Sequence, residues 1–215
     1  MSPNPAVLTW PRPVASGVTV DFLESASDTN DLTEYTFAGV SLGTASADRL
    51  IVVGIAARSV SSTTISSVTI GGVTATVATS GSGAGSKAAI AYATVPTGAT
   101  GDIVVTFSGA HVRCGIGVWR ITGASTTPTD TFTSVTVVRS GTVTIAAGGA
   151  ALAVCYQNTS ATDWTGATEE WDTPSELNAS YSGAKKTSAA GEGATITMSG
   201  ASAYDRLVIA SFEPA

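Results

Sequence analysis

The segment Ser67-Val-Thr-Ile-Gly-Gly-Val-Thr-Ala-Thr-Val77 decides the fold class of this chain. On both sides of the glycine pair, β-branched residues alternate with polar or small ones, which predicts two half-buried strands. Two consecutive glycines supply the positive φ angles that a two-residue turn requires. The segment therefore predicts a tight antiparallel hairpin.

Strand patterns continue along the rest of the chain, and no long helical period accompanies them. In Ile103-Val-Val-Thr-Phe107 the odd positions predict an inward face. One short helical turn is expected at residues 174–178, because Thr173-Pro-Ser-Glu176 combines a capping box with proline at the first helical position. Further strands are predicted at residues 33–37, 49–56, 87–93, 102–108, 115–121, 133–138, 150–156, 195–198 and 206–212.

The two halves of the chain resemble each other. Tyr35-Thr-Phe-Ala38 is similar to Val135-Thr-Val-Val138, and Ile51-Val-Val-Gly-Ile55 then aligns with Ala151-Leu-Ala-Val-Cys155. Further on, Phe107-Ser-Gly-Ala110 is similar to Met198-Ser-Gly-Ala201. Folding two such units on each other predicts an all-β, two-sheet antiparallel sandwich of the jelly-roll (double Greek key) type with an internal pseudo-repeat.

The length of 215 residues fits one large β domain. Four prolines within residues 1–13 predict an extended N-terminal arm rather than a sheet strand. Residues 14–215 are predicted to form a single β-sandwich domain, with pseudo-halves at about 33–123 and 131–215.

The composition points to a protein that is covered by partners. Charged residues make up 12% of the chain, whereas soluble domains usually contain about 25%. The net charge of −6 and the scattered basic residues argue against nucleic-acid binding. The longest apolar run, residues 50–57, is much shorter than the roughly 18 residues of a membrane helix. We therefore expect a homo-oligomer or a larger assembly, without nucleic acid and without membrane insertion.

The start of the chain, Met1-Ser-Pro-Asn-Pro-Ala6, lacks the basic and apolar regions of a signal peptide, which favours folding in a cytoplasm. Cys114 and Cys155 are too few for a disulfide framework, so both are predicted to be buried free thiols.

Three motifs with catalytic precedents lack the context that each requires. Gly39-Val-Ser-Leu-Gly43 has the pattern of a hydrolase nucleophile, but it lies between two predicted strands instead of preceding a helix. His111-Val-Arg-Cys114 offers neither a third group for a dyad nor enough ligands for zinc. Residues 81–87 lack the residues of a phosphate loop around Lys87. We therefore predict no enzyme, no catalytic residues and no cofactor.

An oxygen-rich cluster precedes the strand predicted at residues 33–37. Asp28, Asn30, Asp31 and Glu34 are weak candidates for calcium ligands, since calcium takes six to eight oxygen atoms. Their spacing matches no EF-hand loop, and a solvated turn is the favoured interpretation.

Three aromatic residues, Trp164, Trp171 and Tyr181, lie among carboxylates in the longest polar region of the second half. Exposed rings beside carboxylates are typical of a sugar-binding surface. The other interpretation is that these rings cover the end of the sandwich or an oligomer contact, because aromatic residues dominate cores and interfaces. They are the candidates for a glycan or partner contact.

Several runs resemble a known family: Ala47-Asp-Arg-Leu-Ile-Val-Val-Gly-Ile-Ala56, Ile65-Ser-Ser-Val-Thr-Ile-Gly-Gly-Val-Thr-Ala-Thr76 and Gly115-Ile-Gly-Val-Trp-Arg-Ile-Thr-Gly123. The family comprises mostly uncharacterised jelly-roll-like β-sandwich proteins of tailed bacteriophages and bacterial surface proteins. These motifs are strand and turn patterns, so the resemblance implies a fold and carries no residue roles. It implies a virion structural protein: a head decoration protein, a fibre protein or a tail component.

The leading hypothesis is therefore a bacteriophage particle protein that binds other virion proteins and folds in the host cytoplasm before assembly. It would self-associate or dock through residues 1–13, and display the loops at residues 58–66, 157–163 and 172–182. The alternative is a carbohydrate-binding module or adhesin that recognises host-surface glycans through Trp164 or Trp171.

Overall fold

The structure is a computed structural model of the chain. It describes residues 17–215 except residues 60, 62, 84, 135–136, 159–161, 176–178 and 201. The arm predicted at residues 1–13 therefore lies outside the described residues. The described part is built from antiparallel strands and turns, and it contains no helix.

The first half of the chain forms two sheets. We call the sheet with the order β1-β9-β3-β7-β6 the first inner sheet, and the sheet with the order β2-β8-β4-β5 the first outer sheet. Their strands are β1 (Thr19–Asp28), β2 (Leu32–Ser41), β3 (Leu50–Arg58), β4 (Ile65–Ile70), β5 (Val73–Thr74), β6 (Thr76–Gly83), β7 (Ser86–Thr94), β8 (Thr100–His111) and β9 (Arg113–Thr122).

The second half forms two further sheets. The second inner sheet has the order β10-β17-β12-β15-β14, and the second outer sheet has the order β11-β16-β13. Their strands are β10 (Asp130–Thr133), β11 (Ser140–Ile145), β12 (Gly149–Gln157), β13 (Trp164–Thr165), β14 (Thr168–Ser175), β15 (Ala179–Ser188), β16 (Glu192–Met198) and β17 (Arg206–Phe212).

The two halves have the same topology. Replacing β1, β9, β3, β7 and β6 by β10, β17, β12, β15 and β14 converts the first inner sheet into the second. In each half the first strand pairs with the last, and the second strand with the one before the last, as in a jelly roll. The predicted all-β antiparallel sandwich with an internal repeat is thus confirmed. The number of sheets differs from the prediction, because each half is a complete two-sheet sandwich.

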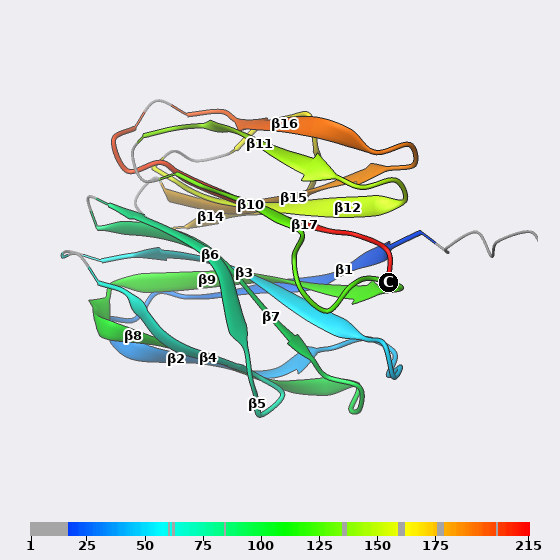
Figure 1. Ribbon diagram of the computed structural model, residues 1–215. Helices are drawn as coiled ribbons and strands as arrows, with labels where there is room; N and C mark the ends of the chain where they lie inside the picture. The colour runs from blue at the N-terminus through cyan, green and yellow to red at the C-terminus, as the bar shows by residue number, and fades with distance from the viewer. Residues whose placement is uncertain are drawn as a thin grey trace, which may run out of the picture.

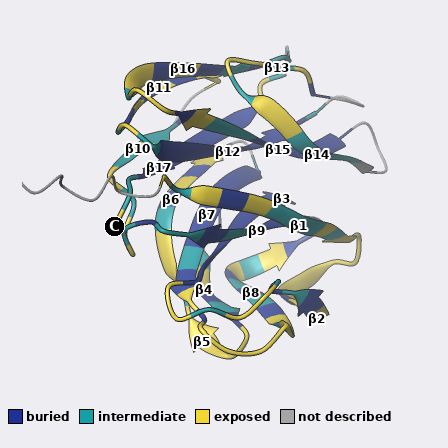
Figure 2. Cartoon of the chain, turned by 90° about the vertical axis from the view of Figure 1, so that its right-hand side faces the viewer, coloured by how far each residue is buried: buried dark blue, intermediate teal, exposed yellow. Residues whose placement is uncertain are grey.

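The sheets stack in the order first outer, first inner, second inner, second outer (Figure 1). Strand β3 illustrates why three cores result. Ile51 and Val53 point into the core of the first sandwich, whereas Leu50 and Val52 point into the core shared with the second inner sheet. A third core lies within the second sandwich. The central strands of the inner sheets, such as β3, are therefore buried on both faces (Figure 2), which requires the near-continuous apolar sequence of residues 50–57.

The glycine hairpin forms as predicted, with φ values of 57° at Gly71 and 79° at Gly72. Its second strand, β5, is only two residues long. After Ala75 the chain crosses to the first inner sheet, where β6 pairs with β7. The hairpin therefore links the two sheets of the first sandwich at one end.

Two local predictions are wrong. Residues 173–175 belong to β14, an edge strand on which a proline is tolerated, rather than to a helical turn, and residues 176–178 lie outside the described residues. Of the described residues in the strand predicted at residues 133–138, only Thr133 is in a strand, while Val137 and Val138 are in none; residues 135–136 lie outside the described residues. The first half also begins earlier than residue 33, because β1 belongs to it.

Candidate functional site

Ser41, the serine of the hydrolase-like motif, ends strand β2 and is not a nucleophile elbow. Its backbone N–H donates to Glu24 Oε1 at 2.6 Å, and its hydroxyl accepts from Gly43 N at 3.3 Å. Ser41 pairs with Thr100 at one end of β8, whereas His111 is at the other end of that strand. Eleven residues of extended chain place the serine and the histidine about 30 Å or more apart.

His111 is a buried structural residue of the first sandwich. Its ring stacks on Phe107 at 3.7 Å between centroids, and its nitrogens lie 2.9 Å from Thr63 Oγ1 and 3.1 Å from Gly109 O. Because the carbonyl only accepts, Nδ1 carries the proton and Nε2 accepts from Thr63. Burial lowers the pKa of His111 to about 4, so the ring is neutral at pH 7.

Both cysteines are free and fully buried, as predicted. Cys114 lies in the core of the first sandwich and Cys155 in the core of the second. Burial raises the pKa of both thiols, because the thiolate is the charged form. Neither group has the thiolate character of a nucleophile or a metal ligand.

The candidate calcium ligands do not converge. Asp28 accepts hydrogen bonds from the backbone and side-chain nitrogens of Asn30, which forms a local turn after β1. Glu34 instead accepts from the Thr106 hydroxyl on the neighbouring strand at 3.0 Å. Among the residues that the structure describes, no three His, Cys, Asp or Glu side chains are grouped closely enough to hold a metal ion.

Trp171 and Tyr181 are buried between the two inner sheets, so the expectation that they form an exposed contact surface is wrong. Trp171 is 5% exposed and Tyr181 is fully buried. The Trp171 indole covers Gly183 and faces Gly117 across the seam; a Cβ on either glycine would lie 2.2 Å from Nε1. Tyr181 packs in the same way against Gly115. These rings join the two sandwiches.

Trp164 keeps a partly exposed ring at the edge of the second outer sheet. Its Nε1 donates to Ser182 Oγ at 2.7 Å. Two of the neighbouring carboxylates are engaged elsewhere: Glu170 accepts from Trp119 Nε1 and pairs with Lys185, and Asp172 accepts from Thr162 N. Since Trp171 and Tyr181 are buried, a platform of several exposed aromatic rings is not formed by these three residues.

The segments predicted to face a partner lie at one end of the molecule (Figure 1). At this end the Arg58 guanidinium lies 4.1 Å above the Tyr204 ring, which links the two sandwiches. Residues 60, 62, 159–161 and 176–178 of these segments lie outside the described residues, and residues 172–175 and 179–182 belong to β14 and β15. The partner-facing role stays a prediction.

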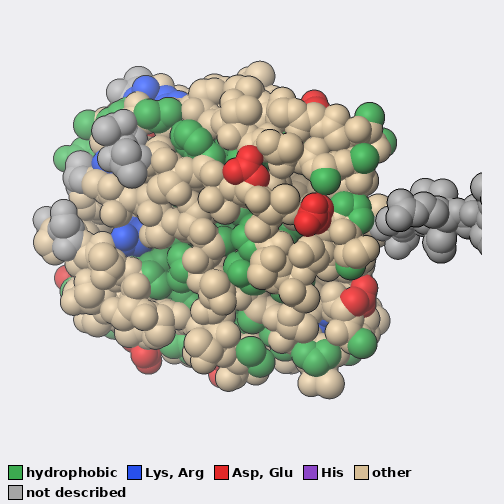
Figure 3. Space-filling view, viewed as in Figure 1, with side chains coloured by type: hydrophobic (Ala, Val, Ile, Leu, Met, Phe, Trp, Pro, Cys, Tyr) green, Lys and Arg blue, Asp and Glu red, His purple; other side chains and the backbone are tan. Residues whose placement is uncertain are grey.

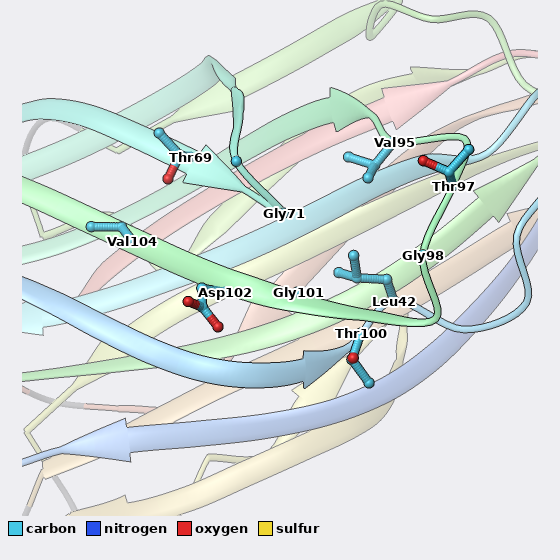
Figure 4. A pocket seen from close by; sticks show the side chains of 11 residues that line it. Leu42, Thr69, Gly71, Val95, Thr97, Gly98, Thr100, Gly101, Asp102 and Val104 are labelled. Carbon is cyan, nitrogen blue, oxygen red and sulfur yellow. The ribbon is translucent and has the colours of Figure 1, made fainter.

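A groove of about 560 Å³ lies at the opposite end of the first sandwich (Figure 4). Three segments form it: the end of β2, the β4–β5 turn, and the connection from β7 into β8. Apolar, hydroxyl and carboxylate side chains and four glycines line it: Leu42, Val95, Val104, Thr69, Thr97, Thr100, Asp102, Gly71, Gly72, Gly98 and Gly101. Its volume falls within the usual range of ligand pockets.

Arg49, on the buried side of the groove, connects two of the segments that form it. The side chain is fully buried, and its guanidinium donates to the carbonyl oxygens of Leu42 (3.0 Å), Gly43 (2.8 Å), Val95 (2.5 Å) and Thr97 (2.6 Å). Burial lowers the pKa of Arg49. A buried cation with so many carbonyl acceptors ties the end of β2 to the β7–β8 connection.

Sequence reasoning missed both Arg49 and the groove. The sequence pattern predicts only strand and turn positions for the glycines and threonines of the groove. It predicts Arg49 at the start of a strand. The signal that could have indicated the site is a charged residue directly before an apolar strand, because such a charge must find buried partners.

The chain matches no protein-family model, and no curated protein or solved structure matches it. Among the described residues, no helix is long and apolar enough to cross a bilayer.

Proposed function

We propose that this protein is a non-catalytic structural component of a bacteriophage particle, which assembles through protein–protein contacts and resides in the virion. Tailed-phage decoration, fibre and tail proteins are the class that the sequence resemblance implies. Jelly rolls are common in viral capsids and in lectins, so the topology is compatible with this role.

The observation that carries the proposal is the structural use of every group that the motifs suggested for chemistry. His111, Cys114 and Cys155 are buried in cores, and Ser41 is far from the one histidine of the chain. The four sheets are stacked, and the central strands of the two inner sheets are covered on both faces. Such a stack of sheets suits a protein that supports a particle mechanically or presents loops on its surface.

The surface supports the same proposal. Only a few charged side chains appear on the face drawn in Figure 3, between apolar and uncharged groups. Since only 12% of the residues in the chain are charged, electrostatic repulsion between copies of the protein is weak. We infer that part of it is covered in an assembly, with residues 1–13 as a docking segment.

Light scattering at several protein concentrations tests the proposal. A defined oligomer such as a trimer, pentamer or hexamer is expected, and deletion of residues 1–13 should weaken attachment to the particle. A monomer at every concentration, together with unchanged attachment of the truncated chain, would contradict assembly through this segment.

The alternative function, an independent carbohydrate-binding module, loses most of its expected residues. Trp171 and Tyr181 are inside the seam, and only Trp164 is partly exposed. Trp171→Ala would therefore act on folding rather than on glycan affinity. If glycans are recognised, other residues must do it.

A further inference from the structure

We propose that the groove at the end of the first sandwich binds a neutral saccharide. The proposal does not depend on the particle assignment, because such a site would serve an attachment protein and a free adhesin equally well. It also places recognition at residues different from the aromatic ones that the sequence suggested.

The lining has the chemistry that sugars require. Thr69, Thr97 and Thr100 present hydroxyl groups that both donate and accept hydrogen bonds. Val104 is partly exposed and supplies an apolar contact for the C–H face of a sugar ring, while Leu42 and Val95 form the buried base of the groove (Figure 4). A few placed polar groups on an otherwise apolar surface are the usual composition of a ligand site.

Asp102 is positioned to accept hydrogen bonds from sugar hydroxyls. Its Oδ1 accepts from Gly39 N at 2.9 Å, which fixes the carboxylate against the end of β2. Within the described residues, Oδ2 has no hydrogen-bond donor and the side chain is exposed. Bonds to a charged acceptor are stronger than bonds between neutral groups.

The charge of the groove excludes an anionic ligand. Among the described residues, no lysine or arginine lines it, and the four hydrogen bonds of the Arg49 guanidinium all go to carbonyls below it. Among the described lining residues, the one charged group that a phosphate or an acidic sugar would meet is the Asp102 carboxylate, which repels it. A neutral ligand rich in hydroxyl groups fits better.

A peptide strand is also a poor fit. Strand addition needs a free sheet edge. The edges of the first outer sheet are β2 and β5, whereas β8, which lines much of the groove, is paired on both sides with β2 and β4. The main-chain groups at the groove are therefore largely engaged within the first outer sheet. Recognition has to come from side chains and from the turns.

The groove is preformed, which lowers the entropic cost of binding. Arg49 holds the end of β2 and the β7–β8 connection in place. In the third segment, the β4–β5 turn, Gly71 N donates to Asp102 O of β8 at 2.8 Å. Gly101 and Gly71 approach so closely that a Cβ on Gly101 would lie 2.8 Å from Gly71 Cα. The glycines are thus needed to bring the walls together.

Nuclear magnetic resonance of the labelled full-length chain tests the proposal, with D-glucose, D-galactose, L-rhamnose and N-acetyl-D-glucosamine as probes at high millimolar concentration. At least one sugar should shift the amide signals of Gly71, Gly98, Gly101 and Asp102. Inorganic phosphate should shift none of them. The affinity for a monosaccharide should be in the millimolar range, as expected for an open site.

Two variants and a matched control locate the binding. Asp102→Asn should weaken it about tenfold, because one charged acceptor is lost, and Thr97→Trp should abolish it by filling the groove. Asp130→Asn is the control, since Asp130 also accepts a backbone N–H, from Thr144 at 2.8 Å, but in the second sandwich. It should leave the affinity unchanged.

Three outcomes would overturn the proposal. The first is the absence of shifts with all four sugars. The second is a set of shifts around Trp164 that Thr97→Trp does not affect, which would place binding at the second sandwich. The third is an equal response to phosphate, which would indicate an anion site.

Discussion

The two sandwiches share one topology but differ at their ends. The first has a four-stranded outer sheet with the groove, whereas the second has a three-stranded outer sheet in which β13 is only two residues long. The first buries a cation, Arg49, which is satisfied by carbonyls. The second buries an anion, Asp205, which accepts from Arg139 at 2.7 Å and from Ser202 N at 3.0 Å.

This difference shows what a repeat constrains. Strand order follows from pairing and from burying two faces of each inner sheet, so both halves keep it. The turns and outer strands carry fewer packing demands, so they can diverge and acquire separate roles. The groove depends on the β4–β5 hairpin. In the second sandwich β13 corresponds to β4, but no strand corresponds to β5.

The largest effect is expected where the sandwiches meet. Trp171→Ala should lower the free energy of unfolding by about 3–5 kcal/mol, because it leaves a cavity opposite Gly117. Urea denaturation followed by circular dichroism measures it. Trp164→Ala is the control and should cost less, since that ring is partly exposed. Equal stabilities of the wild type and Trp171→Ala would mean that the seam does not hold the halves together.

Arg49→Met should destabilise the first sandwich by about 2–4 kcal/mol, because buried carbonyls lose their donors. In this variant, amide hydrogen exchange should become faster at residues 95–99 by more than it does in β15 and β16, the matching strands of the second sandwich. If exchange rises equally in both halves, the role of Arg49 is global rather than local to the groove.

Acid should loosen the first sandwich before the second. The folded-state pKa of His111, about 4, is below the ordinary histidine pKa of 6.5. The unfolded chain therefore binds the proton first, and stability falls as the pH drops from about 6.5 to about 4, by about 2–3 kcal/mol.

His111→Phe should remove this part of the pH dependence while keeping the stacking on Phe107. Unfolding midpoints in urea between pH 7 and pH 4 measure it for both chains. Parallel curves for wild type and variant would show that carboxylates, not His111, govern the acid response.

The smallest effects are expected for the surface ion pairs, one on each sandwich. Arg120 pairs with Asp21 at 2.9 Å and Lys186 with Glu192 at 3.4 Å. Arg120→Met and Lys186→Met should each change the free energy of unfolding by less than about 1 kcal/mol. Arg120→Met is also the charge-matched control for Arg49→Met, and a loss as large as that of Arg49→Met would show that burial does not explain the difference.

Much of the fold was predictable from local patterns. The glycine pair at residues 71–72 specified its turn, and the correspondence of residues 51–55 with residues 151–155 matched β3 with β12 in the two repeats. Strands β1, β11, β14, β15 and most of β6 are not predicted, because their many serine, threonine, glycine and charged residues weaken the apolar alternation, and the two-residue strand β13 is not predicted either. Candidate site residues are less predictable: the sequence leaves open whether Trp171 and Tyr181 form a sugar-binding surface or a covered contact, and the structure buries both.

The sequence by itself determined the all-β class, the repeat and the burial of both cysteines, since these depend on short-range alternation and composition. Only the tertiary structure decided that four sheets stack, that Trp171 lies in the seam and that Arg49 supports a groove. Each of these depends on which sheet faces are covered by segments distant in sequence. A continuous apolar strand such as residues 50–57 indicates two covered faces, but it does not identify the partner on either side.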